Sequence, residues 1–250
     1  SEEQPDFILV KTGIYDEVVK ITQPVSIIGA CNLGVVLAPS EPSETEPAIN
    51  IDLTSISEQK PVTLRELSIK LNKRPGVKFM NNSQQAVISS LSIANAINYG
   101  LAFAENSSGA IIKDIAIMNT SSSASLLGIP DIVDTACYSR CAPLINGSGI
   151  DIMGGKVSID RALISQNESS GINVAEMDTE LSLKNAVIRE TNYRQVDETR
   201  GEGLNVDFFS TVHIENVNIH HNHDKGISVH NDATLNGIEL IIEETKHTQY

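Results

Sequence analysis

The chain has 250 residues, a mass of 27.0 kDa and a formal net charge of −14. Because a negative surface repels phosphate backbones, and because no basic stripe runs along the sequence, we expect no nucleic-acid partner. No apolar run approaches the roughly 20 residues of a membrane-spanning helix, so we expect no membrane insertion. Hydrophobic residues make up 40% of the chain, enough for a packed core.

The composition favours many short strands joined by tight turns. The sequence contains 31 Ile, 18 Val and 20 Asn, but only five Phe and five Tyr. The β-branched side chains Ile and Val pack well on pleated strands. Asn tolerates the left-handed backbone conformation that tight turns need. This balance predicts an all-β protein.

A repeat of about 24 residues follows an N-terminal cap region at 1–24. Apolar residues recur at positions 1, 3, 6 and 8 of a template. A loose copy begins near Val25, and clear copies begin at Val62, Ala86, Ala110, Val157, Leu181, Val212 and Ala233. Most copies are followed by a Gly that opens a third apolar pair, at Gly76, Gly100, Gly149, Gly171, Gly203 and Gly226.

Each repeat therefore predicts one coil of three short strands. The extra residue between positions 3 and 6 breaks the alternation and indicates a corner, and the Gly marks a second one. We expect left-handed residues at a further corner, at Asn95, Asn119, Asn167 and Asn222. Stacking about eight coils over residues 25–240 closes a continuous core. In this arrangement Ile152, Val174 and Val206 would stack in one interior column.

This pattern resembles the right-handed parallel β-helix of the pectin-lyase-like superfamily. The opening, from Ile8 through Gly13, Tyr15 and Glu17 to Pro24, is similar to the first coil of many members. The resemblance implies a single-stranded right-handed parallel β-helix but not an activity, since this fold hosts lyases, hydrolases, epimerases, esterases and adhesins. Motifs of the pectin methylesterases, alginate epimerases and polygalacturonases are absent from the sequence.

Two insertions interrupt the repeat, at 119–148 and 190–202. Insertions in solenoids become loops, often on the binding face. Both leave the same corner, so we expect them to wall a shallow groove over the third strands. The polar residues expected to face this groove are Asp151, Asn173, Asn205, Asp207 and His230, and the insertions add Tyr138, Arg140, Tyr193, Arg194 and Arg200.

These residue types suit an acidic polysaccharide. Tyr rings can stack on sugars, and Arg pairs bidentately with carboxylates. The binding candidates are Tyr138, Arg140, Asn173, Tyr193, Arg194 and Asn205. The catalytic candidates are Asp207, His230, Arg200 and Asp151, with an Asp207–His230 hydrogen bond expected between neighbouring coils.

Asp151 and Asp207 are also the candidate ligands of a Ca²⁺ ion that would neutralise a uronate. The alternative interpretation of the polar face is ordinary solvated surface. The His-rich stretch at 220–224 is either a metal site or a solvated turn, and its spacing matches no closed zinc pattern.

The sequence thus predicts an extracellular carbohydrate-binding or carbohydrate-active module, lyase-like if it is an enzyme. The alternative is a non-catalytic structural or adhesive surface module. Either residues 241–250 close the last coil, or the sequence belongs to a longer protein with further domains. Cys137 and Cys141 are close enough to form a disulfide, which leaves Cys31 as a buried thiol; three reduced thiols are the alternative.

Overall fold

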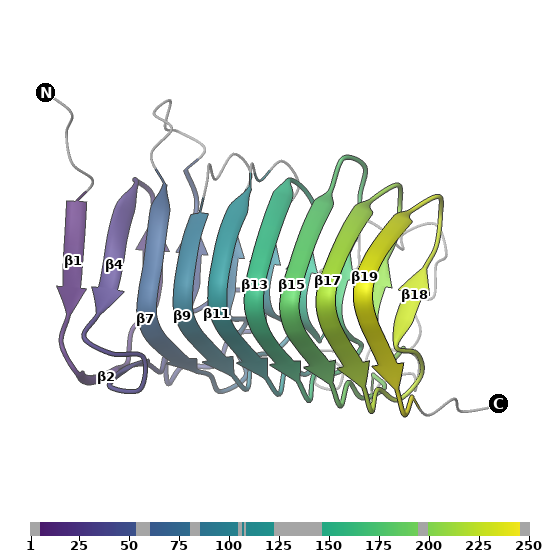
Figure 1. The fold of residues 1–250 in the computed structure, drawn as a ribbon. Coiled ribbons are helices and arrows are strands. Elements are labelled where there is room, and N and C mark those ends of the chain that lie inside the picture. Colours follow the sequence, from purple (N-terminus) through teal and green to yellow (C-terminus); the bar gives the residue numbers. More distant parts are fainter. Residues whose placement is uncertain are drawn as a thin grey trace, which may run out of the picture.

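The structure, a computed structural model, describes residues 6–53, 61–80, 86–104, 107, 109–122, 147–194 and 200–245. Within these residues all the regular elements are strands, and no helix has the length and apolarity of a membrane span. The strands stack into two long sheets that face each other along the molecule (Figure 1).

Sheet A has eleven strands and sheet B has eight. The strands of sheet A are β1 (Asp6–Val10), β2 (Gly13–Tyr15), β4 (Val25–Gly29), β5 (Val35–Leu37), β7 (Val62–Lys70), β9 (Ala86–Ala94), β11 (Ala110–Met118), β13 (Lys156–Ser165), β15 (Glu180–Arg189), β17 (Thr211–His220) and β19 (Thr234–Glu243). Those of sheet B are β3 (Val19–Ile21), β6 (Ile49–Ile51), β8 (Val77–Phe79), β10 (Tyr99–Phe103), β12 (Ser148–Ile152), β14 (Ser170–Val174), β16 (Glu202–Val206) and β18 (Ile227–Val229).

The described strand pairs are parallel, and each strand pairs with its counterpart in the next coil. The chain therefore alternates between the sheets as it advances, which is a parallel β-helix. The N-terminal region 1–24 takes part in this stacking, because β1, β2 and β3 pair with β4, β5 and β6. Seven of the eight strands of sheet B, β6 to β18, lie within the predicted coils, whereas β3 lies in the region that the sequence analysis expected to be a cap.

The predicted corner inside each repeat is present, but it does not separate two strands. A single residue with positive φ bends each long strand of sheet A, and pairing continues on both sides of it. The first two predicted strands of a coil thus form one bent strand. The bend residues are Glu66, Ser90, Asp114, Arg161, Asn185, Asn216 and Glu239.

The core lies between the two sheets and consists of the predicted apolar columns. Ile152 pairs with Val174, and Val174 pairs with Val206, in successive strands of sheet B. All three side chains are fully buried. Phe79 and Phe103 stack in the same interior, with ring centroids 4.9 Å apart. The predicted interior column is confirmed.

The register of the last coil differs from the sequence prediction by two residues. In β19 the interior positions are Leu235, Gly237, Leu240 and Ile242, which pair with the core residues of β17. The apolar template began instead at Ala233 and placed Ile238 inside, whereas Ile238 is 68% exposed. Gly237 explains the error. It occupies an interior position that is apolar in the other coils, so the apolar template matches Ala233, Leu235, Ile238 and Leu240 better than it matches the true register.

Two further expectations differ from the structure. Asn95 and Asn119 have the predicted left-handed conformation, but in two later coils the preceding residues Gln166 and His221 adopt it instead. Cys31 is exposed rather than buried, because β4 ends at Gly29 and the chain turns outward before β5. Most of the insertion at 119–148 lies outside the described residues, together with Tyr138, Arg140, Cys137 and Cys141, whereas only 195–199 of the insertion at 190–202 do.

Candidate functional site

The polar column predicted on sheet B is a buried hydrogen-bonded ladder. Asp151, Asn173 and Asn205 are paired residues of β12, β14 and β16, and they point away from the core because their neighbours in each strand point into it. Asn173 Nδ2 donates to Asp151 Oδ1 at 2.7 Å, and Asn205 Nδ2 donates to Asn173 Oδ1 at 2.8 Å. Each side chain is at most 6% exposed.

This ladder changes the interpretation of the predicted groove. Ala102 and Ser228, in the same outward column, are also buried. From β10 to β18 the described residues of this column are therefore covered, and they form neither an open groove nor a solvated face. Asn173 and Asn205 were expected to bind sugar, but their amides are engaged in the ladder. An Asn amide donates and accepts at once, so a stack of Asn side chains satisfies its own hydrogen bonds when water is excluded.

Asp207 and His230 lie in the next outward column, but they do not form the expected hydrogen bond. Asp207 Oδ1 accepts from the Phe208 backbone N–H at 2.9 Å and from Asn231 Nδ2 at 2.7 Å. His230 Nε2 pairs with Ser228 Oγ at 2.6 Å. β16 ends at Val206, and the chain turns through two residues with positive φ, so Asp207 stabilises that turn.

Asp151 and Asp207 are too far apart to share an ion or to act as an acid pair. Asp207 lies two coils along from Asp151 and two residues beyond the paired position. At about 4.8 Å per coil and 3.3 Å per residue, the two positions are roughly 12 Å apart. Ca²⁺ needs oxygen ligands within about 2.6 Å. The described part of the chain contains no group of three His, Cys, Asp or Glu placed to hold a metal ion.

The four predicted catalytic residues are likewise not gathered in one place. Arg200 precedes β16 and Asp207 follows it, so the strand separates them by seven residues, or roughly 20 Å. Asp151 lies two coils away, and His230 faces the end of the strand where Asp207 lies. No single substrate atom could be reached by all four.

The structure does bring residues together at the corner before β16. The rings of Tyr193 and His223 meet edge to face, with centroids 4.7 Å apart. Gly201, which has a φ of +108°, lies against both residues. A Cβ at Gly201 would lie 3.1 Å from the Cβ of His223 and 3.4 Å from the backbone nitrogen of Tyr193. We call this group the corner cluster; its residues are Tyr193, Arg194, Arg200, Glu202, His223, Asp224 and Lys225.

Backbone hydrogen bonds hold the corner cluster in place. The His223 N–H donates to the Thr191 carbonyl at 2.9 Å, and the Asp224 N–H donates to the Gly201 carbonyl at 3.2 Å. Tyr193, Arg194, Arg200 and His223 are half-buried, so each presents part of its surface to solvent. Of the predicted site residues, Tyr193 therefore contacts the His-rich stretch, and Arg194 and Arg200 flank this contact along the chain.

Glu202 is the residue of this cluster that the sequence did not reveal. Its side chain is 8% exposed, and burial raises the pKa of the carboxyl, although the charges of Arg200 and Lys225 act to lower that pKa. Glu202 Oε2 has no hydrogen-bond partner in the described structure. The sequence does contain a signal for this position. Glu202 directly precedes Gly203, just as Ser148 and Ser170 precede Gly149 and Gly171, so Glu202 belongs to the third strand of its coil and not to the insertion at 190–202.

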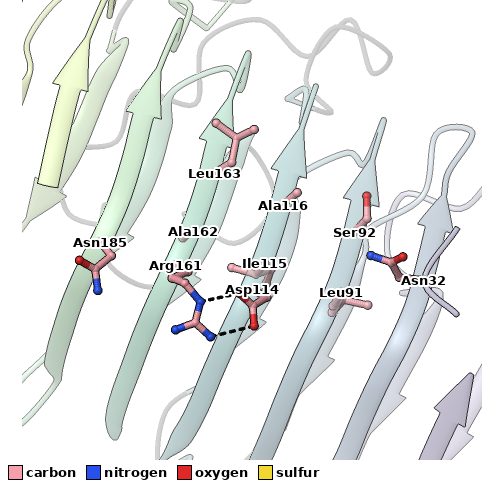
Figure 2. A pocket seen from close by; sticks show the side chains of 10 residues that line it. All are labelled: Asn32, Leu91, Ser92, Asp114, Ile115, Ala116, Arg161, Ala162, Leu163 and Asn185. Carbon is pink, nitrogen blue, oxygen red and sulfur yellow. Dashed lines mark hydrogen bonds and ion pairs between the residues drawn. The ribbon is translucent and has the colours of Figure 1, made fainter.

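A separate groove lies at the bend of sheet A (Figure 2). It has a volume of about 320 Å³ and crosses β9, β11, β13 and β15. Arg161 reaches across it to Asp114 with two hydrogen bonds, from Nε at 2.6 Å and from Nη2 at 2.9 Å. Asn185 continues this row by donating to Asp160 at 2.7 Å. The groove is shallow, and its polar groups bind one another across neighbouring coils.

The structural comparison identifies the fold. The chain is similar to the crystal structure of pectate lyase Pel9A, with a TM-score of 0.50, 14% sequence identity and coverage of 92% of this chain. The chain therefore shares the parallel β-helix fold of this pectate lyase. It spans 59% of the Pel9A chain. It matches the A-module of the mannuronan C-5 epimerase AlgE4 of Azotobacter vinelandii less well, with a TM-score of 0.35 and 10% identity over 98% of this chain and 89% of that one. No protein-family model and no curated protein sequence matches it.

Proposed function

We propose that this β-helix is a carbohydrate-binding module that holds an acidic polysaccharide at the corner cluster. The observation that carries the proposal is the Tyr193–His223 ring pair, fixed beside Arg194 and Arg200 at the corner from which an insertion leaves. An aromatic ring held at the surface offers a flat apolar face to a sugar ring. The guanidinium groups offer paired donors to a uronate carboxylate.

The charge distribution supports an anionic ligand. The chain as a whole carries a net charge of −14, so a polyanion is repelled unless it meets a local group of cations. The corner cluster contains three cationic residues, Arg194, Arg200 and Lys225, against the two acidic residues Glu202 and Asp224, and Lys225 pairs with Asp224 at 3.5 Å. Cationic residues therefore outnumber acidic residues in the cluster, in contrast to the chain as a whole.

The module is proposed to bind rather than cleave. Arg200 and Asp207, two of the residues expected to catalyse β-elimination, lie at opposite ends of β16. The name of Pel9A makes pectate the first polymer to test. Acidic polysaccharides are polymers of cell surfaces and cell walls, so this ligand would place the module outside the cell.

A non-catalytic structural or adhesive module is the second candidate. The buried Asp151–Asn173–Asn205 ladder favours it, because a polar column that satisfies itself stabilises the coil stack and leaves nothing for a substrate. This candidate differs from the first in needing no sugar at the corner cluster. A binding measurement therefore separates the two.

The test is binding of polygalacturonate, its fully methyl-esterified form and alginate, measured by calorimetry at low salt. We expect the two acidic polymers to bind and the ester to bind weakly. Arg200→Ala should weaken binding roughly tenfold, since charged hydrogen bonds contribute about 1.5–3 kcal/mol. Tyr193→Ala should weaken binding by a similar factor or less, because it removes the ring face that packs against the sugar. Lys113→Ala, which removes an exposed cation from β11, is the matched control and should change nothing.

Absence of binding to every polymer would reject the carbohydrate proposal and favour the structural module. The same samples would be followed by ultraviolet absorbance, because β-elimination leaves an unsaturated uronate that absorbs. A rise in absorbance would show a lyase and would contradict the assignment as a binding module alone.

A further inference from the structure

Three buried side chains in one column of sheet B have polar atoms without partners. Ser170 of β14 pairs with Glu202 of β16. Ser148 occupies the equivalent position of β12, because Ile150 pairs with Ile172, and Ser148 and Ser170 each lie two residues before these isoleucines. Ser148 and Ser170 are fully buried, and Glu202 is 8% exposed. Ser148 Oγ, Ser170 Oγ and Glu202 Oε2 lack hydrogen bonds in the described structure. Burial of this column disfavours a carboxylate at its end, and this effect on the pKa of Glu202 is larger than the opposing effects of Arg200 and Lys225.

Glu202 is placed where its charge state decides the charge of the corner cluster. Its carboxyl interacts electrostatically with Arg200, Lys225 and Asp224. The chain beside it, at Gly201, packs against His223, Asp224 and Tyr193. An ionised Glu202 would add a second negative charge next to Asp224. A protonated Glu202 adds none, and its hydroxyl becomes a donor.

We infer that Glu202 is the specificity-determining residue of the corner cluster: protonated, it lets the cations there attract a uronate carboxylate, and ionised, it opposes that carboxylate. This inference rests on the proposed function. Glu202 acts through the charge of the site rather than as a contact of the ligand, so it is a positioning residue. Burial raises its pKa, which extends the range of pH over which the protonated form persists.

Binding of an acidic polysaccharide should therefore weaken as the pH rises and Glu202 ionises. The other titratable or charged groups facing Glu202 are Arg200, Lys225 and Asp224, with His223 and Tyr193 on the adjoining turn. His223 also loses positive charge as the pH rises. The wild type and a Glu202 variant share all of these groups, so the difference between their pH profiles isolates Glu202.

The experiment compares polygalacturonate binding by the full chain and by Glu202→Gln over a pH series from weakly acidic to weakly alkaline. Gln matches the size of the protonated acid and cannot ionise. We expect Glu202→Gln to bind as the wild type does at low pH and about fivefold more tightly at high pH, the effect of one like charge near the ligand. Glu180→Gln, at an exposed glutamate that begins β15, should retain the wild-type profile.

Superimposable profiles for the wild type and Glu202→Gln would overturn this inference and leave the proposed function standing. If the wild type bound no polyuronate at any pH, the proposed function and this inference would both fail. The carboxyl ¹³C shift of Glu202 in the unmodified protein provides a measurement that needs no variant. We expect it to titrate above the ordinary value of 4.5, and titration at or below that value would overturn the inference.

Discussion

Asn173 Nδ2 donates a hydrogen bond to Asp151 Oδ1 at 2.7 Å, from one coil back to the coil before it. A carboxylate only accepts, so this contact fixes which way the Asn173 amide faces. Its oxygen then points to the following coil and accepts from Asn205 at 2.8 Å. One Asp at the base of the column thereby orients the amides of the next two strands of sheet B.

Asn173→Ala should destabilise the protein by about 2–4 kcal/mol, because buried polar groups on both sides lose a partner at about 1–3 kcal/mol each. Asp151 would lose its amide donor, and Asn205 would lose its acceptor. The midpoint of urea unfolding, followed by circular dichroism, measures the change. Asn236→Ala is the control: it removes an amide from an exposed position of β19 whose φ is not positive, and it should cost no more than about 0.5 kcal/mol. Equal losses would show that the column is open to water.

Gly76→Ala should destabilise the protein by at least about 2 kcal/mol, because overpacking against rigid neighbours costs roughly 1–3 kcal/mol or more. A Cβ at Gly76 would lie 1.9 Å from the carbonyl oxygen of Gly100 in the next coil, and backbone cannot rotate away as a side chain does. Gly237→Ala is the matched control, since the nearest atom to its Cβ would be 3.8 Å away. The melting temperature of Gly76→Ala should be clearly lower than that of Gly237→Ala. Similar melting temperatures for the two variants would contradict the close approach of the coils at Gly76.

The sequence was most informative where one residue type had to repeat in every coil. The interior column through Ile152, Val174 and Val206 follows from spacing alone, because each inward side chain must be apolar. The outward column through Asp151 was located equally well, but its burial was not predictable. Alternation says which face a side chain points to, and it does not say what lies over that face.

The last coil shows a second limit of pattern reading. Gly237 occupies an interior position where other coils carry Ile or Leu, and the predicted register is wrong by two residues as a result.

At the candidate site, Tyr193 and Arg200 were found because aromatic and cationic residues are scarce in this chain. Glu202 was missed because Glu is common in it, and only burial makes this one unusual.

Arg161→Ala should lower the midpoint of urea unfolding slightly at low salt and clearly less at high salt, as expected for an exposed ion pair with bidentate geometry. Arg161 binds Asp114 through two donors and Asp160 through a third at 2.6 Å, and its side chain is 52% exposed. Lys184→Ala removes a single-donor pair with Glu215 and should cost less. Urea midpoints at low and high sodium chloride measure both. An Arg161 effect that does not change with salt would mean that packing, not charge, stabilises the bend.

Glu202→Gln and Glu180→Gln should change stability with opposite dependence on pH. Burial raises the pKa of Glu202, so the folded protein keeps a proton that the unfolded chain releases. Its contribution to stability is full below its ordinary pKa of 4.5 and is lost as the pH rises above that value to the folded pKa. The Gln variant has no such loss, so its stability relative to the wild type should increase as the pH rises.

Glu180 behaves in the reverse manner because its hydrogen bond from Lys156, with the Nζ–Oε2 distance at 2.8 Å, lowers its pKa. Its contribution is present above 4.5 and is lost as the pH falls through the lowered pKa. Glu180→Gln should therefore be less stable than the wild type at neutral pH and approach it in acid. Chemical unfolding of the three proteins across a pH series measures both trends. If Glu202→Gln followed the same trend as Glu180→Gln, the carboxyl of Glu202 would be ionised and stabilised by Arg200 and Lys225 in the folded protein.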